Sequence, residues 1–325
     1  MARDIKVLFD EDVERYADMR SLIDVMKGVL RLQKDEKLTS PPRHYVKFPG
    51  KGDLVFTIGG TGQYAGFRVY NTFGRIPHTG EFIPVANPDA GPEDRQVVVV
   101  HDMETNQIQG VIIGNHISAW RAGSISAAAM DMMAPRQVHT LCIMGTGHHS
   151  RTQLLGALAV RKFDEIRVYS RKPENRRRFV EKMEPAVGQA IKASDSAEQA
   201  VRGADVVMSA SNSATPIYDA AWIAPNAYVG SAGPKFRTTS ELPKEIGARA
   251  TYLCTDTPKQ FEAYRENHFL TGTADFDRVR PLNEWLDEET RPKDPKGIRL
   301  FMLTGLSGTE VITGAHIIQA AKAAG

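Results

Sequence analysis

The chain has 325 residues, of which 42% are hydrophobic and 25% charged, as in a folded protein with room for two compact domains. Lysine and arginine total 41 against 39 aspartate and glutamate, so the net charge of +2 disfavours nucleic acid and anionic membranes as partners. The first residues lack the apolar core of a signal peptide, and no stretch has the roughly 18 apolar residues of a membrane span. We therefore expect a soluble cytoplasmic protein with a small-molecule partner.

The N-terminal part is expected to combine helices with a sheet. Apolar residues recur at three- and four-residue steps from Val13 to Leu30, which predicts one amphipathic helix ended by Pro41 and Pro42. Short runs of strand character then follow at 46–48, 54–58, 66–73, 97–101 and 111–113. An alanine-rich segment, 117–133, predicts a second long helix.

From His139 onward, strand-like and helix-like segments alternate. The expected strands lie at 138–144, 166–169, 205–211, 227–233 and 250–256, with helices at 151–162 and 174–183 between the first of them. Such alternation predicts βαβ units, a doubly wound parallel sheet and the α/β class. The last segment, 305–325, is expected to be a loop followed by a helix, 310–323.

The first strand of the alternating region runs into a glycine-rich turn that opens a helix. Gly145 permits a tight turn, Gly147 lets the backbone approach a pyrophosphate, and the small Ser150 replaces the third glycine of a dinucleotide fingerprint. Thr146 and His148 complete the turn. The N–H groups that begin the helix suit phosphates, so the pattern predicts dinucleotide binding, with a purely structural turn as the alternative.

The end of the next strand bears on the choice between NAD and NADP. An acidic residue for the adenosine ribose is missing there, and the chain reads Ser170, Arg171 and Lys172, followed by arginines at 176–178. These residues suit a 2′-phosphate, which favours NADP(H) slightly over NAD(H). NAD(H) stays open, because Glu174 could still reach a ribose and the arginines could be a solvated helix start.

Several segments together resemble one enzyme family. Residues 120–129, WRAGSISAAA, are similar to the Arg-Thr-Ala-Ala helix of the ornithine cyclodeaminase and mu-crystallin family. The stretch 229–242, with VGSAG and then Glu241-Leu242, resembles its Ile-Asn-Ala-Ile-Gly motif and the Glu-Leu that follows it. With Pro42-Arg43 and GFRVYN added, the resemblance covers almost the whole chain.

The resemblance implies a division into three segments. Residues 1–130 would form a discontinuous α+β domain for substrate binding and dimerisation, 131–304 a Rossmann dinucleotide-binding domain, and 305–325 a helix returning to the first domain. It also implies a homodimer. By family position, further cofactor contacts are expected at Ser209, Ala210, Ser211, Ser231 and Gly233, and no metal is expected.

Three arginines fall at substrate-site positions of the family: Arg43, Arg68 and Arg121. Each can bind a carboxylate through two parallel hydrogen bonds, although any one of them could instead serve an ion pair. The Arg68 position is usually lysine in the family, and arginine scarcely deprotonates, which argues against a role in proton transfer. Glu310 lies where the family's C-terminal motif tends to be acidic, and a helix-capping role is as plausible as a catalytic one.

The position that holds an acidic catalytic residue in ornithine cyclodeaminase is Lys235 here. A lysine cannot hold the distal amine that must close a ring, but it can bind a second carboxylate or donate a proton. The catalytic candidates are therefore Lys235, Arg68 and Arg121, and the substrate-binding candidates are Arg43, Arg68, Arg121 and Lys235.

The resemblance implies an NAD(P)H-dependent imine reductase or amino acid dehydrogenase. The several cations favour a small acidic substrate, such as iminosuccinate or aspartate. Two alternatives stay open: a cyclodeaminase-type ammonia lyase with recycled NAD, and a non-enzymatic NADPH-binding protein like a crystallin. Fold does not select among them.

Overall fold

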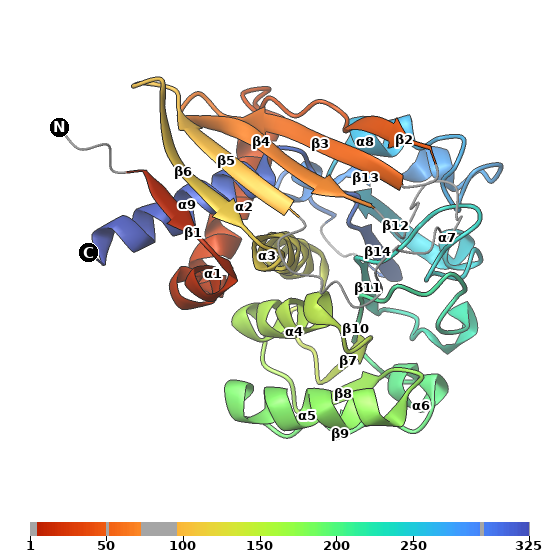
Figure 1. Ribbon diagram of the computed structural model, residues 1–325. Coiled ribbons are helices and arrows are strands. Elements are labelled where there is room, and N and C mark those ends of the chain that lie inside the picture. The colour runs from red at the N-terminus through yellow and green to blue at the C-terminus, as the bar shows by residue number, and fades with distance from the viewer. Residues whose placement is uncertain (1–4, 50–51, 73–95, 293–295, 325) are drawn as a thin grey trace. The chain divides into compact units, whose positions relative to one another are not determined.

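The structure is a computed structural model that describes residues 5–49, 52–72, 96–292 and 296–324 (Figure 1). The chain divides into two compact units, Met1–Arg121 with Gly305–Gly325, and Ala122–Thr304. The division falls inside helix α3 (His116–Met133), whereas the expected domain boundary lay at 130. The expected strand end at Phe73 lies outside the described residues.

The first unit contains a six-stranded sheet in the order β1-β6-β5-β4-β3-β2 among the described residues. All neighbouring pairs are antiparallel except β1 and β6, which are parallel. The five predicted strands fall on β2 to β6, which are mostly longer than expected. The bounds are β1 (Lys6–Leu8), β2 (His44–Phe48), β3 (Gly52–Gly60), β4 (Tyr64–Asn71), β5 (Gln96–Asp102) and β6 (Gln107–Ile113).

Helices cover one face of this sheet. The helix α9 (Thr309–Ala323) packs on β4 and β5, where a Cβ atom at Gly66 would lie 3.4 Å from Val311. The single N-terminal helix predicted from the apolar spacing is wrong: the chain forms α1 (Asp10–Tyr16) and α2 (Met19–Lys34). Asp18 separates them, because its carboxylate accepts the Ser21 N–H at 2.7 Å and so caps a new helix.

The second unit contains an eight-stranded sheet, again counting described residues, and every pair in it is parallel. Its order is β13-β12-β14-β11-β10-β7-β8-β9, so the first strand, β7, is the point from which the chain winds in both directions. The strands are β7 (Thr140–Met144), β8 (Glu165–Tyr169), β9 (Lys192–Ala193), β10 (Val206–Ser209), β11 (Tyr228–Ser231), β12 (Ala250–Thr255), β13 (Arg280–Pro281) and β14 (Ile298–Met302). The predicted α/β class and doubly wound parallel sheet are confirmed.

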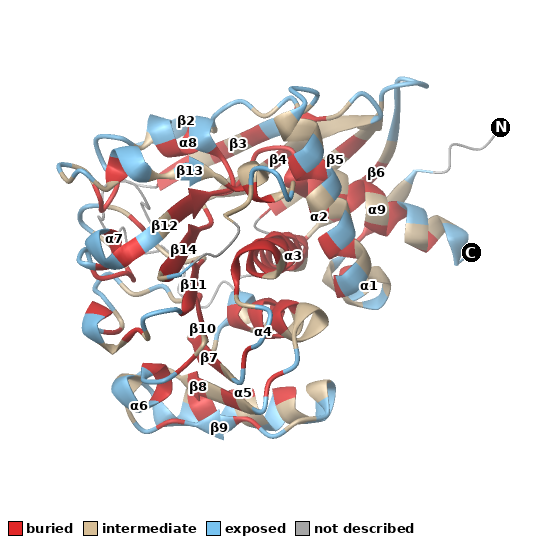
Figure 2. Ribbon diagram, turned by 180° about the vertical axis from the view of Figure 1, so that it is seen from behind, coloured by how far each residue is buried: buried red, intermediate tan, exposed pale blue. Residues whose placement is uncertain are grey.

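Helices alternate with these strands, as α4 (His148–Val160), α5 (Pro173–Val187), α6 (Ala197–Val201), α7 (Ile246–Arg249) and α8 (Pro258–Ala263). Every residue of β10, β11 and β14 is buried, and Figure 2 shows these strands in the buried colour. Central strands of a parallel sheet are covered on both faces, which explains why these strands are mostly apolar. Within the described ranges, each helix is too short or too polar to cross a membrane.

Candidate functional site

The glycine turn follows the central strand β7 and opens α4, as the spacing predicts. Gly145 adopts φ +118°, a conformation that side chains rarely allow. A Cβ atom there would lie 2.6 Å from the Ala210 carbonyl oxygen and 2.8 Å from Ser150 Oγ. The Ser150 hydroxyl donates to that same carbonyl at 3.2 Å, which ties α4 to the end of β10. Gly145 and Ser150 therefore hold the turn tightly against β10.

Gly147 has a different environment. It is the N-cap residue of α4, and none of the described side chains makes a cap hydrogen bond there. No described atom lies within 4 Å of a Cβ atom built at Gly147. A helix of 13 residues thus begins at an open, positive end, where a pyrophosphate would be stabilised by backbone N–H groups. The cradle fits a dinucleotide, with Thr146 and His148 on either side of Gly147.

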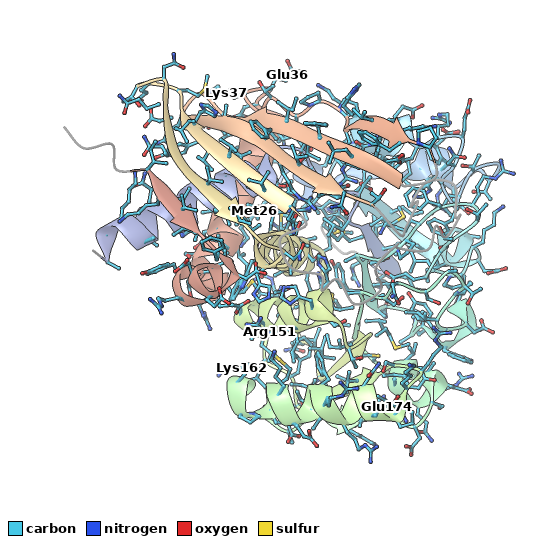
Figure 3. The ribbon with its side chains drawn as sticks, in the orientation of Figure 1. Met26, Glu36, Lys37, Arg151, Lys162 and Glu174 are labelled. Carbon is cyan, nitrogen blue, oxygen red and sulfur yellow. The ribbon has the colours of Figure 1, made fainter. Side chains whose placement is uncertain are left out.

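The carboxyl end of β8 carries the basic residues expected to read the adenosine ribose. Arg171 is exposed, whereas Arg176 is buried and donates to the Ser170 carbonyl at 2.7 Å while its guanidinium lies 5.3 Å from the centre of the Tyr169 ring. Arg176 thus stabilises the turn between β8 and α5 through its hydrogen bond to Ser170. Glu174, labelled in Figure 3, lies exposed in the first turn of α5.

The carboxyl ends of β10 and β11 meet around one buried carboxylate, that of Glu241. It accepts hydrogen bonds from Ser211 N and Oγ, each at 2.8 Å, from Ser231 Oγ at 2.6 Å and from Gly233 N at 2.7 Å. Ser209 ends β10, Ala210 follows it, and both are buried. Glu241 is not among the site residues predicted from the sequence, although a Glu eight residues after a Gly-rich strand end was a usable signal.

Lys235 follows the same strand end and is 7% exposed. Its ammonium group donates to the backbone carbonyls of Gly233 at 2.5 Å and Ser231 at 3.3 Å. The charge also acts on His268: burial, and secondarily Lys235, lowers the pKa of this imidazole to about 3. Lys235 is therefore fixed by the backbone and is not an exposed loop lysine.

In the first unit, two of the predicted arginines share one acidic partner. Arg68 Nη1 on β4 lies 2.7 Å from Glu310 Oε1, and Arg121 Nη2 on α3 lies 2.5 Å from the same oxygen. Arg68 also donates through Nε to Gln96 at 2.6 Å and lies over the Tyr70 ring at 4.1 Å. Glu310, which sequence reasoning left between capping and catalysis, therefore lies within the arginine group.

Arg43 reaches the same group from the segment before β2. Its Nη2 donates to the Gly305 carbonyl at 3.2 Å. Gly305 adopts φ +98°, and a Cβ atom there would lie 1.9 Å from Arg43 Nη2 and 3.9 Å from Arg121 Nη1. The positive φ favours glycine at this position, and the sequence around Gly305 did not reveal its contact with Arg43. We call Arg43, Arg68, Arg121 and Glu310 the arginine group.

The arginine group keeps a strong positive charge. Burial raises the pKa of the Glu310 carboxyl, but Arg121, Arg68 and Arg43 outweigh it and hold the pKa at about 2. Burial lowers the pKa of Arg68, while Glu310 offsets part of that effect. Guanidinium groups remain protonated at neutral pH, so the four side chains of the arginine group carry three positive charges and one negative charge.

The all-parallel sheet, its glycine turn and the buried arginine group define a Rossmann-type α/β protein with a second α+β unit. The model of the ornithine cyclodeaminase/mu-crystallin family matches residues 3–323. The chain belongs to this family, and the predicted resemblance is confirmed.

Two curated relatives show the range of names within the family. Mouse ketimine reductase mu-crystallin is 28% identical over 161 residues, which is 50% of this chain and 50% of that protein. The match thus spans about half the length of that relative. Delta(1)-pyrroline-2-carboxylate reductase of Bacillus thuringiensis subsp. konkukian is 24% identical over 237 residues, covering 70% of this chain and 72% of the relative.

Three solved structures share the fold. The Thermococcus litoralis Delta(1)-pyrroline-2-carboxylate reductase with NADH and L-proline has a TM-score of 0.85 at 21% identity, covering 98% of both chains. The Paracoccus denitrificans iminosuccinate reductase with NAD⁺ has 0.83 at 17%, covering 99% and 98%. An archaeal alanine dehydrogenase dimer with bound NAD has 0.83 at 21%, covering 98% and 97%. The predicted class, an NAD(P)-dependent oxidoreductase, is the class of these relatives.

Proposed function

We propose that this protein is an NAD(P)H-dependent imine reductase or amino acid dehydrogenase acting on a small dicarboxylic imino or amino acid, such as iminosuccinate or aspartate. The observation that carries the proposal is the arginine group. Arg68 and Arg121 both pair with Glu310, Arg43 helps to lower the pKa of that carboxyl, and the charges of these four side chains sum to +2. A monocarboxylate would neutralise half of that charge, and a dicarboxylate all of it.

The arginine group would bind and orient the substrate. Arg68 is held by Glu310, Gln96 and Tyr70, so its fork has little freedom and loses little entropy on binding. Arg121 is held by Glu310 from a different element. Two fixed guanidinium groups would clamp a carboxylate in one orientation, which is the condition for aligning a reacting carbon.

A bound nicotinamide dinucleotide would supply hydride to the imine carbon. The chain's own contribution would be charge and geometry: Arg68 and Arg121 would hold the substrate carboxylates, and Lys235 would donate a proton to the imine nitrogen. The hydride would form the new C–H bond while the carbon–nitrogen π pair moves to nitrogen, and the proton would complete the amine. Arg68 and Arg121 act here by electrostatic stabilisation.

For the cofactor, we propose a slight preference for NADP(H). The support is Arg171, exposed at the end of β8 beside Ser170, with no acidic residue at 170–173. A guanidinium group can pair with a 2′-phosphate, whereas an acidic residue there would repel it. The cofactor contacts that we propose are Gly145, Thr146, Gly147, His148, Ser150, Ser170, Arg171, Ser209, Ala210, Ser211, Ser231 and Gly233.

The test of this function is the absorbance of reduced nicotinamide, followed with oxaloacetate, pyruvate and 2-oxoglutarate, each with ammonia. Oxidation of NADPH or NADH that is fastest with oxaloacetate supports the proposal. Ammonia release from ornithine without net oxidation would instead indicate a cyclodeaminase. Tight NADPH binding with no turnover of any acid would indicate a cofactor-binding protein without this activity.

We also propose that the protein is a homodimer that packs through one face of the first unit's sheet. Gly66 and Gly110 face α9. Because successive residues of a strand point to opposite faces of the sheet, the side chains next to these glycines point away from α9. That face carries apolar residues on several strands, including Val7 at 53%, Phe48 at 43% and Ile58 at 53% exposure. Large exposed apolar surfaces mark interaction sites.

A second copy of the chain is the occupant that we propose for this face, since an archaeal alanine dehydrogenase of the same fold is a dimer. Sedimentation should give twice the mass of the chain, and Ile58→Lys should shift the protein toward the monomer. Met103→Lys, an equally exposed apolar residue in the β5–β6 turn, is the matched control and should not. A monomeric wild-type protein would refute the dimer.

A further inference from the structure

Glu241 is the most completely hydrogen-bonded carboxylate in the site of the second unit. Its exposure is 0%, and its two oxygens receive four hydrogen bonds from three residues, Ser211, Ser231 and Gly233. Burying an ionised carboxylate is costly unless hydrogen bonds replace the lost water. Here the replacement is complete, so the carboxylate is stable only while these three residues keep their positions.

The contact also constrains Gly233. A Cβ atom at this residue would lie 2.3 Å from the Glu241 carboxylate and 2.6 Å from the Ser211 carbonyl oxygen, so only glycine allows the approach. Lys235 binds the same segment from its carbonyl side, at Ser231 and Gly233. The backbone after β11 is therefore fixed by a negative group on its N–H side and a positive group on its C=O side.

The position of this network relates it to one half of a dinucleotide. In a doubly wound sheet, the cofactor crosses the carboxyl ends of the strands at the switch point, with its pyrophosphate on the first glycine turn. In this chain that turn follows β7, the basic end of β8 lies on one side, and β10 and β11 lie on the other. With the adenosine at β8, the nicotinamide half falls at the ends of β10 and β11.

We propose that Glu241 is the positioning residue for the nicotinamide half of the cofactor. It touches neither cofactor nor substrate; it acts through Ser211, Ser231 and Gly233, whose backbone and hydroxyl groups it orders. The inference rests on the proposed dinucleotide function. It adds that the two halves of the cofactor are held by independent devices: the glycine turn with β8, and the Glu241 network.

The test compares whole cofactors with their fragments in the full chain. Glu241→Gln keeps the shape, but its NH₂ group faces two of the four donors and cannot accept from them. The dissociation constants of NADPH and NADH should rise about tenfold or more, while those of 2′-phospho-ADP-ribose and ADP-ribose, which lack nicotinamide, should stay within about twofold. Glu245→Gln, an exposed neighbour, should change neither set.

A general loss of stability would weaken whole cofactors and fragments alike, and that result would overturn the inference, as would unchanged NADPH and NADH binding. Glu241→Asp keeps the charge with a shorter reach and should give a smaller change of the same selectivity; it decides the matter if the Gln variant does not fold. A wild-type protein that binds neither cofactors nor fragments would refute the proposed function together with this inference.

Discussion

The arginine group and the glycine turn are the two regions proposed here to bind anionic groups, and they are built in opposite ways. The glycine turn uses backbone N–H groups, a helix end and the absence of side chains, all within a few consecutive residues. The arginine group uses charged side chains from β4, α3, α9 and the segment before β2. Charge in the first case comes from peptide dipoles and in the second from paired ions, so substitutions should separate the two regions experimentally.

The largest effect is expected for Arg121→Ala, which removes a charge that holds both Glu310 and the proposed substrate. Breaking one partner of a buried ion pair should lower the free energy of unfolding by about 3 kcal/mol and kcat/KM by roughly a thousandfold. Denaturant unfolding and steady-state kinetics measure the two losses. Arg20→Ala, an exposed arginine in the same unit, is the control. A variant that kept full activity would show that the arginine group does not bind substrate.

The pH dependence of stability tests the ionised state of Glu310. Its carboxyl pKa is held at about 2 in the folded protein, against 4.5 for the free group, so its contribution is complete above pH 4.5 and is lost as the pH falls toward 2. Over this range, wild type should lose about 3 kcal/mol more unfolding free energy than Glu310→Gln. Glu104→Gln, which is exposed, should follow wild type. Parallel curves for wild type and Glu310→Gln would contradict the ion-paired arrangement.

In the glycine turn, a substitution should affect binding without affecting stability. Gly147→Ala places its Cβ atom where no described atom lies within 4 Å, so the melting temperature should hardly change. A cofactor pyrophosphate needs that space, and its dissociation constant should rise about fiftyfold. Calorimetric titration and thermal unfolding check both statements, with Gly62→Ala, an exposed turn residue that also meets no described atom, as the control. If Gly147→Ala lowered cofactor binding and stability together, the glycine turn would not differ from the arginine group in the way predicted.

The smallest effect is expected at Arg171. Arg171→Ser should weaken NADPH about tenfold and leave NADH nearly unchanged, because only the former carries a 2′-phosphate to pair with guanidinium. The measurement is the ratio of the two dissociation constants. Arg202→Ser, in an exposed pair with Glu198, should leave that ratio as it is. If the ratio does not move in the Arg171 variant, the residue does not select the cofactor.

Sequence reasoning worked where structure follows from neighbouring residues. The parallel sheet, the turn at Gly145 and the strands of the first unit were all predicted, because apolar alternation and glycine spacing are local patterns. The N-terminal helix was wrong for a local reason as well: the apolar spacing continues across Asp18, and only its side-chain cap on Ser21 interrupts the helix.

The arrangement within the site could not be predicted in the same way. Arg68 and Glu310 are separated by 242 positions, and nothing near either residue specifies their pairing. The same holds for Arg43 and Gly305, whose hydrogen bond joins residues 262 positions apart. Glu241 was present in the motif, but its four donors come from strand ends whose approach depends on the assembled sheet. Long-range pairing is set by packing rather than by local pattern.

The place of β14 has a consequence for the newly synthesised chain. This strand lies between β11 and β12 in the sheet, yet Ile298–Met302 leaves the ribosome after both of them. Until it emerges, the edges of β11 and β12 have no partner, and unpaired apolar edges are the usual starting points of aggregation. Any message truncated before residue 298 would therefore produce a chain with an open gap in the middle of its sheet, a natural target for chaperones and proteases.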